Sequence, residues 1–514
     1  MSASATPANS PAPQTDAGHE LAVLLRSRVP LIVIETHEET RALALLASLA
    51  IRLARSGATQ MFQWTVTDGL RRLDLDLGTP DRTKDEPLQV LRHIRATHLA
   101  GIYVLVDFHP FLSDPKHVRL IKDICLDYPR AARTLVLLSH ELQLPRELEA
   151  FSARFNLAMP GREERRDLIE GIAREWAGAN PGARVKADRH ALDLLVENMS
   201  GLTTADTARL ARKAIFDDGA LSGADLPALM QAKYQLLNRG GVLSYEHDTA
   251  RFADVGGLEN LKQWLRQRKP AFEAKAVAYG RPLDPPKGVL LLGVQGCGKS
   301  LAARAAAGIF QVPLLRLDFA AIHSKWHGES ERNLRDTLKT AELMAPCVVW
   351  VDEIEKGVAT GDGDSGVSRR ALGTFLTWLA EKKSNVFVVA TANDITALPP
   401  ELIRKGRLDE IFFVDLPRES VRAQILDIHA RKRGAPLAPA EIAQLAAASE
   451  GFSGAELEQA IVSALYGAHA AQQPLTAAHV LNEIRNTRPL STVMAERIAD
   501  LRAWASERTV PADA

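Results

Sequence analysis

The stretch GVLLLGVQGCGKS, residues 288–300, decides the fold of this chain. Its run of four apolar residues predicts a buried parallel strand, and Lys299 opens a predicted helix. Between strand and helix, Gly293, Gly296 and Gly298 loosen the backbone, so that N–H groups can turn inward around phosphate oxygens. The pattern G-x-x-x-x-G-K-S in this strand–loop–helix context predicts a nucleotide phosphate site.

Two side chains at the end of this phosphate loop have predicted contacts of their own. Lys299 can reach the β- and γ-phosphates of a nucleotide, and the hydroxyl group of Ser300 can ligate Mg²⁺. The helix N-terminus adds partial positive charge where the anion would lie. The alternative is a glycine-rich turn that binds no ligand, and the acidic residues farther along the chain argue against it.

The composition limits the classes of protein to which the chain can belong. A length of 514 residues predicts two or three domains. Lys plus Arg and Asp plus Glu both number 63, and this zero net charge argues against a dedicated nucleic-acid-binding protein. Cys125, Cys297 and Cys347 have no paired spacing, so they indicate neither a disulfide framework nor a zinc site.

The sequence carries no signal for a membrane or for secretion. No apolar stretch approaches the roughly 20 residues of a membrane span. Residues 1–20 are rich in Ala, Pro and Ser and lack the basic start and apolar core of a secretory signal, so we expect a disordered tail. We therefore expect a cytoplasmic protein with no membrane partner.

Strand-like and helix-like segments alternate over residues 21–245, which predicts an α/β domain with a mostly parallel sheet. Strands are predicted at residues 29–36, 62–66, 102–108 and 134–139, and the pattern becomes helical from Gly161 onward.

The second half of the chain, from about residue 250 to 490, repeats this plan. Four blocks match in the same order, namely 102–110 with 347–355, 134–148 with 386–402, 155–169 with 412–426 and 200–215 with 451–465. The alternative is that any two α/β domains resemble each other at this level, but four matches in one order favour an ancient duplication.

The first copy lacks the residues that nucleotide chemistry requires. HEETRALA, residues 37–44, takes the place of the phosphate loop. Asp107 is retained as an acid at the end of its strand, but Phe108 replaces the acid that should follow it, and Ser139 falls where the second copy has Asn393. We expect that this first copy does not hydrolyse nucleotide and is a scaffold, a regulatory surface or a substrate adaptor.

Acidic residues in the second copy complete the predicted site. Asp352 and Glu353 end the strand CVVWVDE, about fifty residues after the phosphate loop. An acid at this edge of a parallel sheet suits Mg²⁺ held through water, and a second acid beside it can deprotonate an attacking water molecule. Asn393, at the tip of the next predicted strand, can help to place that water or the γ-phosphate.

Residues from about 250 to 490 resemble an AAA+ ATPase of the AAA clade in the strict sense. The motifs that carry the resemblance are FADVGGLENLK (252–262), GVQGCGKS (293–300), KWHGESERNLR (325–335), WVDEIEKG (350–357), ATANDITALPPELIRKGRLDE (390–410) and GFSGAELEQA (451–460). The resemblance implies an α/β fold with a P-loop AAA+ module, in which a parallel sheet with flanking helices (250–416) is followed by a small helical lid (417–490). A degenerate AAA-like α/β module without a phosphate loop (21–245) would precede it, and a C-terminal helix and tail (491–514) would follow.

The resemblance also implies the residues that hold ATP and Mg²⁺. Asp254, Val255 and Gly256 would lie near the adenine. The loop residues implied to bind ATP are Gly293, Val294, Gln295, Gly296, Cys297, Gly298, Lys299, Ser300 and Leu301. Ser300 and Asp352 would ligate the metal, with Glu353 and Asn393 as catalytic residues.

Arg404 and Arg407 are expected one helical turn apart at the end of a short helix. Their alternative reading is as surface salt-bridge partners, but they follow Asn393 at the spacing of arginine fingers in ring ATPases. The resemblance implies that they act on the ATP of a neighbouring subunit. The active form would then be a nucleotide-stabilised homo-oligomeric ring, usually a hexamer.

The whole chain resembles a narrower group, the AAA ATPase family known from algal plastid genomes and many bacteria. One departure from the common phosphate loop is Cys297, where Thr or Ser is usual. Either this is a small residue that fits, or its thiol has a lowered pKa near a helix N-terminus and its oxidation blocks ATP binding.

Lys325, Trp326 and His327 lie where the family has its pore loop, and the Lys-Trp pair resembles that of severing and filament-disassembling members. A large flat side chain there can grip an extended polypeptide, whereas the alternative is a simply buried tryptophan. Two functions remain open: a motor that threads a protein substrate, or an ATP-dependent switch whose first module binds a regulatory partner. A nucleic-acid motor is disfavoured by the zero net charge.

The C-terminal segment 490–514 reads as one amphipathic helix followed by a tail. Its apolar positions Met494, Ile498, Leu501 and Trp504 have helical spacing, and we expect them to pack on the lid or on a neighbouring subunit.

Overall fold

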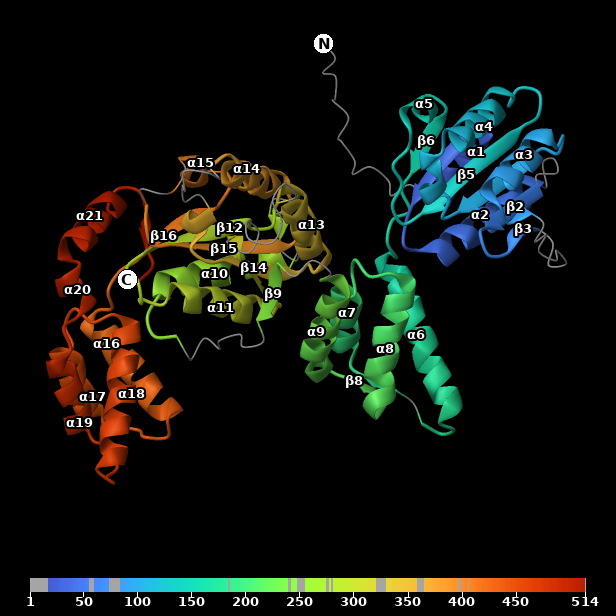
Figure 1. The fold of residues 1–514 in the computed structure, drawn as a ribbon. Coiled ribbons are helices and arrows are strands. Elements are labelled where there is room, and N and C mark those ends of the chain that lie inside the picture. Colours follow the sequence, from blue (N-terminus) through green and yellow to red (C-terminus); the bar gives the residue numbers. More distant parts are fainter. Residues whose placement is uncertain are drawn as a thin grey trace, which may run out of the picture. The chain divides into compact units, whose positions relative to one another are not determined.

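The computed structural model describes most of the chain as two compact units, residues 1–168 with 202–208 and residues 169–201 with 209–514 (Figure 1). The described residues are 17–54, 60–73, 84–183, 185–238, 242–246, 255–273, 277–278, 281–319, 330–357, 365–395, 398, 400–404 and 406–513.

The first unit contains a six-stranded sheet in the order β3-β2-β4-β5-β1-β6. Its strands are β1 (Leu31–Glu35), β2 (Gln60–Thr65), β3 (Gly69–Arg72), β4 (Gly101–Val106), β5 (Arg133–Ser139) and β6 (Ser152–Phe155). All pairings are parallel except the β2–β3 hairpin. The four strands predicted from apolar runs are therefore confirmed as β1, β2, β4 and β5.

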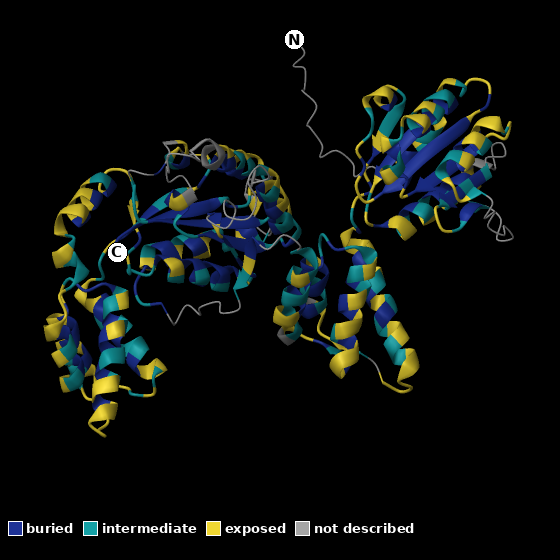
Figure 2. Ribbon diagram, viewed as in Figure 1, coloured by how far each residue is buried: buried dark blue, intermediate teal, exposed yellow. Residues whose placement is uncertain are grey.

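Every residue of β4 and β5 is buried, because helices cover both faces of this sheet (Figure 2). These helices are α1 (Ala17–Arg26), α2 (Glu39–Ala54), α3 (Pro87–Ala96), α4 (Pro115–Leu126) and the short α5 (Arg146–Glu149), with the single-turn η2 (His109–Ser113) after β4. α1 begins at Ala17, within the last residues of the stretch predicted to be a tail, and residues 1–16 lie outside the described residues.

The predicted helical stretch after Gly161 is also confirmed. It consists of α6 (Arg162–Ala179), α7 (Arg189–Asn198), α8 (Thr204–Asp218) and α9 (Leu226–Leu237), with a minor pair of strands, β7 (Lys186–Ala187) and β8 (Ala220–Leu221).

The second unit is built on a seven-stranded sheet in the order β17-β16-β12-β15-β14-β13-β9. The strands are β9 (Leu243–Glu246), β12 (Gly288–Gly293), β13 (Leu314–Leu317), β14 (Cys347–Val351), β15 (Val386–Ala392), β16 (Glu410–Val414) and β17 (Val510–Pro511). Only β9 runs antiparallel to its neighbour. The apolar run of the phosphate-loop stretch forms the central part of β12, as predicted.

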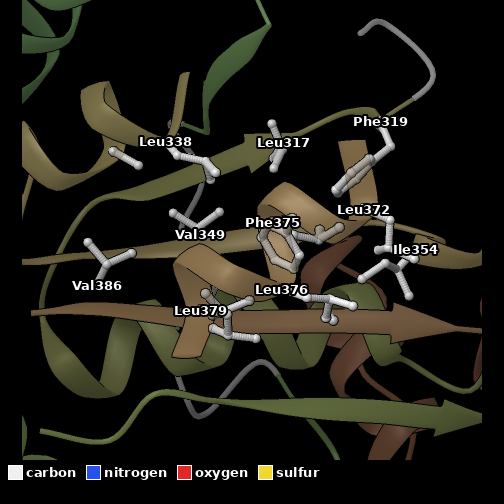
Figure 3. Packing of buried hydrophobic residues seen from close by; sticks show 14 of the residues in the cluster. Leu317, Phe319, Leu338, Val349, Ile354, Leu372, Phe375, Leu376, Leu379 and Val386 are labelled. Atoms are coloured by element: carbon white, nitrogen blue, oxygen red, sulfur yellow. The ribbon is translucent and has the colours of Figure 1, made fainter. Parts of the chain in front are cut away.

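Helices pack on both faces of this sheet and form two buried clusters. They are α10 (Glu259–Phe272), α11 (Lys299–Phe310), α13 (Ser330–Leu343), α14 (Ser365–Glu381) and the short α15 (Pro400–Ile403). On one face, Phe375 and Leu379 of α14 lie over the sheet beside Val349 (Figure 3). The helical lid follows as α16 (Glu419–Lys432), α17 (Pro439–Ala448), α18 (Gly454–Ala470) and α19 (Ala477–Asn486), with its own buried cluster.

The strand order supports the predicted duplication. The parallel strands lie in the order β2-β4-β5-β1-β6 in one sheet and β13-β14-β15-β12-β16 in the other. When the parallel strands of each sheet are counted along the chain, the first, second and later strands take the same positions in both sheets. The register corrects one residue match. With Asp107 aligned on Asp352, Ser139 corresponds to Thr391, and it is Glu141 that falls at Asn393.

The C-terminal segment differs from its expected course. α20 (Leu490–Val493) and α21 (Ala495–Ala505) form two helices instead of one. Leu501 and Trp504 of α21 pack into the cluster of the seven-stranded sheet and not into that of the lid. The expected tail contributes β17, which pairs parallel to β16 because Val510 and Pro511 register with Phe412 and Phe413.

Within the described residues, no helix is both long and apolar enough to cross a membrane.

Candidate functional site

The loop between β12 and α11 has a backbone that only glycine accommodates at its two ends. Gly293 has φ 154°, and a Cβ atom there would lie 2.0 Å from the carbonyl oxygen of Val414. Gly298 has φ 93° and is the N-cap of α11, where no side chain caps the helix. The first-turn N–H groups of α11 are thereby left for a ligand, and such an uncapped N-terminus suits an anion. The loop therefore fits the phosphate groups that its sequence predicts.

Lys299 is buried inside this loop. Its Nζ donates hydrogen bonds to the backbone oxygens of Gly293, at 2.8 Å, and of Val294, at 2.9 Å. Burial lowers the pKa of Lys299 to about 8, against the opposing attraction of neighbouring groups that include Glu355 and Asp352. Lys299 therefore lies where it could bind an incoming phosphate group. The negative charge of that phosphate would then replace the two backbone oxygens as the partner of the Lys299 ammonium group.

The two acids after β14 are held by Thr391 of the adjacent strand β15. The Thr391 hydroxyl group donates to Oδ1 of Asp352 at 2.9 Å and accepts the N–H of Glu353 at 3.0 Å. Glu353 has φ 47°, a left-handed conformation that is uncommon for a residue with a side chain. Arg316 of β13 pairs with Oδ2 of Asp352 at 3.1 Å. These contacts fix the direction of the Asp352 carboxylate and the backbone of Glu353 at the carboxyl edge of the sheet.

Asn393 contacts the second of these acids directly. Its Nδ2 donates to Oε1 of Glu353 at 2.8 Å, and its own N–H donates to Oε1 of Glu355 at 2.8 Å. Lys356 forms an ion pair with Oε2 of Glu353. The predicted pair of Glu353 and Asn393 is thus brought together, with a carboxylate able to act as a base.

Sequence reasoning missed two residues of this arrangement, Thr391 and Glu355. Glu355 is buried, and burial raises its pKa. Its Oε2 atom is buried without a hydrogen-bond partner among the described residues. The available signals were a polar residue inside the apolar strand VFVVATA and a third acid in the run DEIE.

A cavity of about 750 Å³ lies beside the phosphate loop, between the sheet and the lid. Gly256, Cys297, Ile425 of α16 and Gly454 of α18 are among its lining residues. Val255 is buried and does not line the cavity. A space of this size next to a phosphate cradle fits a nucleoside.

The lid contacts the phosphate loop directly. The N–H of Ala455 in α18 donates to the carbonyl oxygen of Gly296 at 3.0 Å. Ser453 and Glu456 form a capping box that fixes the start of this helix. The position of the lid is therefore coupled to the shape of the loop.

The environment of Cys297 disfavours the thiolate form. The redox hypothesis, that oxidation of a thiol with a lowered pKa blocks ATP binding, requires an environment that favours it. Burial raises the pKa of its thiol group to about 12, although nearby Lys299 acts in the lowering direction. The start of α11 does not overcome this desolvation, so of the two readings of Cys297 the structure favours the small residue that fits over the thiol with a lowered pKa.

The remaining predicted loop residues have varied exposure. Gln295 and Ser300 are exposed, and Leu301 is half-buried against the cluster behind the sheet. Four predicted residues, Asp254, Lys325, Trp326 and His327, lie outside the described residues.

The predicted short helix is present as α15 and ends at Ile403, directly before Arg404. Arg407 is not one helical turn farther along it, because Gly406 adopts φ 103° in the turn between the two arginines. Arg404 is exposed. Arg407 is half-buried, and its Nη1 atom is buried without a partner among the described residues. Within the described part of the chain, neither guanidinium group forms an ion pair with Asp352 or Glu353.

Family models match three parts of the chain. The N-terminal domain of SpoVK-like AAA ATPases matches residues 17–157, and the second domain of the same proteins matches residues 163–240. The model of the ATPase family associated with various cellular activities (AAA) matches residues 289–416.

Relatives match over nearly the full length. The AAA domain-containing protein ycf46 of Guillardia theta is 35% identical over 94% of this chain and 94% of its own. The ycf46 protein of Pyropia yezoensis is 33% identical over 95% and 97% of the two chains. Among solved structures, the AAA domain of FIGL-1 is 24% identical, covers 54% of this chain and 95% of its own, and has a TM-score of 0.46.

Proposed function

The chain belongs to the AAA ATPase family, in the group of the ycf46 AAA domain-containing proteins, and on this premise we propose that it hydrolyses ATP to remodel a protein substrate. The single observation that carries the proposal is the hydrogen bond of 2.8 Å between Asn393 and Glu353, at the sheet edge that follows the phosphate loop. It supports a carboxylate held in a fixed direction, as a general base must be.

Each residue of the site has a proposed role in hydrolysis. Lys299 and the first-turn N–H groups of α11 bind the phosphate groups of ATP. Glu353 accepts a proton from the attacking water molecule, and Asn393 orients that carboxylate. Ser300 and Asp352 would hold Mg²⁺, which supplies positive charge to the phosphate oxygens when it is bound.

The nucleoside would occupy the cavity beside the loop. Gly256 lines this cavity together with Ile425 of the lid, which supports the proposal that Gly256 lies near the adenine. For Asp254 and Val255 the same place remains a proposal from the resemblance. Because Ala455 of the lid bonds to Gly296, loss of the γ-phosphate would change the loop and the lid together.

We place the site at an interface between subunits of a ring, with a hexamer as the proposed form. Arg404 and Arg407 support this proposal because neither forms an ion pair with Asp352 or Glu353 among the described residues, where Nη1 of Arg407 also has no hydrogen-bond partner. In the ring they would stabilise the transition state on the neighbouring subunit.

The proposed coupling to a protein substrate is through Lys325, Trp326 and His327. The second candidate is a switch whose first module binds a regulatory partner without threading. This switch function is favoured by the sheet of the first module. That sheet keeps the same order of parallel strands as the second module although it lacks the phosphate loop.

A substrate trap distinguishes the two. Tagged Glu353→Gln protein is recovered with ATP, and the co-purifying proteins are identified, with the double variant that adds Trp326→Ala as the matched comparison. Proteins held by the single variant and lost from the double variant support threading. Proteins held equally by both refute threading and favour the switch.

A further inference from the structure

Three side chains of types that can ligate a metal ion meet at the carboxyl edge of the N-terminal sheet. In the sequence they lie well before the proposed ATP site. Asp107 follows β4, His109 begins η2 directly after it, and His140 follows β5. β4 and β5 are adjacent parallel strands, so residues after them converge at one edge. One ligand atom from each of the three lies within 4.8 Å of the others.

This cluster occupies the place that the ATP site occupies in the second module. Asp107 corresponds to Asp352, and with the same strand register His140 corresponds to Ala392. His37 falls at the position of Gly293, where the phosphate loop begins. At the edge of the sheet where the second module has its phosphate loop and acids, the first module therefore has histidines and Asp107. These side chains are of the types that ligate metal ions, whereas a phosphate loop binds an anion.

We propose that the first module binds a divalent transition metal ion, of the Zn²⁺ class, through Asp107, His109 and His140. Imidazole nitrogen and carboxylate oxygen are ligands that Zn²⁺ takes in proteins, and three protein ligands leave one position for water. At bond lengths of about 2.0–2.2 Å, tetrahedral ligand atoms lie about 3.4 Å apart. Since the ligand atoms lie within 4.8 Å of one another, each pair needs to approach by at most about 1.4 Å.

The surroundings support ligand geometry at two of these residues. Asp107 has φ 51°, a left-handed conformation whose strain is typical of functional positions. The Oγ atom of Ser139 lies 3.1 Å from Nδ1 of His109. This contact orients the imidazole ring and leaves Nε2 for the ion, as an outer-shell partner of a ligating histidine does.

The side chains are also accessible from solvent. The Asp107 side chain is 59% exposed, and that of His109 is 29% exposed. His140 is exposed, and its ring lies beside that of His109, with 5.0 Å between centroids, and beside that of His37, with 5.9 Å. An ion can therefore enter from solvent, and the open coordination position would face outward.

The test uses full-length protein without a histidine tag, stripped with EDTA and kept in excess Mg²⁺ and ADP so that the second module is filled. Zn²⁺ is titrated in competition with a chromophoric chelator, and Co²⁺ is added separately to record its visible absorption. We expect one ion per chain, a tetrahedral Co²⁺ spectrum, and at least a tenfold loss of affinity in Asp107→Asn, His109→Ala and His140→Ala.

His98→Ala is the matched control, because His98 is exposed in the same unit but lies before β4, at the opposite edge of the sheet. It should bind Zn²⁺ as the unchanged protein does. Two results would overturn the proposal: a chain that takes up less than one ion, or cluster variants that bind as tightly as the His98 control. Circular dichroism of each variant establishes that it is folded.

Discussion

Asn393 and Glu353 are joined by a hydrogen bond of 2.8 Å, from Nδ2 of the amide to Oε1 of the carboxylate. The two residues follow adjacent parallel strands, β15 and β14, so the sheet itself sets their separation. Because Oε2 of the same carboxylate pairs with Lys356, each oxygen of Glu353 has a partner within the chain.

We predict that Asn393→Ala slows ATP hydrolysis by about tenfold or more while leaving ATP affinity within a few-fold of its original value. The reason is that Glu353, the proposed general base, would lose the contact that orients it, and a general base contributes about 10²–10⁴ in rate. Single-turnover hydrolysis and binding of a fluorescent ATP analogue measure the two quantities. Asn385→Ala is the control, because Asn385 lies before β15 at the other end of the same strand. Equal rates for the two variants would contradict the orienting role.

The pKa of Lys299 predicts how nucleotide affinity depends on pH. With a pKa lowered to about 8 in the free protein, Lys299 is charged below pH 8, and the affinity for Mg²⁺-ADP should be constant there. Above pH 8 binding must take up a proton, so the apparent Kd should rise by up to about tenfold per pH unit.

Calorimetry in two buffers of different ionisation enthalpy measures this proton uptake directly. It should approach one proton per ADP at pH 9 and fall to zero at pH 7. Uptake that is unchanged across this range would mean that Lys299 is not the titrating group. Lys299→Arg provides the comparison, because arginine stays charged throughout.

Arg404→Ala should bind ATP normally and hydrolyse it slowly, by about 10³–10⁵ if it is an arginine finger. A finger acts on the neighbouring subunit, so mixing Arg404→Ala protein with Glu353→Gln protein should restore part of the activity. In such mixed rings, some interfaces pair the intact Glu353 of one subunit with the intact Arg404 of its neighbour. Arg431→Ala, an exposed arginine of the lid that pairs with Asp427, serves as the control. Mixed rings with no recovered activity would argue against action in trans.

The sequence predicted those parts of the fold and the site that a local pattern encodes. The apolar run before Gly293 became β12, and the acids after CVVWV reached the sheet edge, because strand order places them there. Thr391 and Glu355 were missed because their importance depends on partners 38 or 39 residues away in the chain.

The metal-ligating cluster of the first module was hidden for a similar reason. Asp107 and His109 are close in sequence, but His140 joins them only through the pairing of β4 with β5. Of the two readings of Cys297, the raised thiol pKa favours the small residue that fits over the redox-sensitive thiol. The sequence left both open because the helix N-terminus is visible in it, whereas the burial that outweighs the helix is a tertiary property.

Cys297 should consequently be inert toward thiol reagents in the folded, nucleotide-free protein. A pKa of about 12 leaves almost no thiolate at pH 7.5, and Cys125 and Cys347 have pKa values raised to about 12 as well. Iodoacetamide at this pH should label none of the three until denaturant is added, and peroxide should leave ATP hydrolysis unchanged. Rapid labelling of Cys297, located by mass spectrometry, would restore the redox hypothesis.

The C-terminal residues should contribute to nucleotide affinity, although they lie more than two hundred residues beyond the phosphate loop. Pro511 and Asp513 line the cavity beside that loop. Two hydrogen bonds from α10 hold this segment there. The N–H of Leu261 donates to the carbonyl oxygen of Ala512 at 3.2 Å, and the N–H of Glu259 donates to the side-chain Oδ1 of Asp513 at 3.1 Å.

We therefore predict that deletion of residues 509–514 weakens ADP binding by about tenfold and lowers the Tm, since β17 and one rim of the cavity are lost together. Asp513→Ala separates the two effects, because it removes one hydrogen bond, worth about 1 kcal/mol, and leaves β17 in place. It should weaken binding by a few-fold with a change in Tm of only a few degrees. If the deletion lowers the Tm but binds ADP as tightly as the full chain, β17 stabilises the sheet and has no part in the nucleotide site.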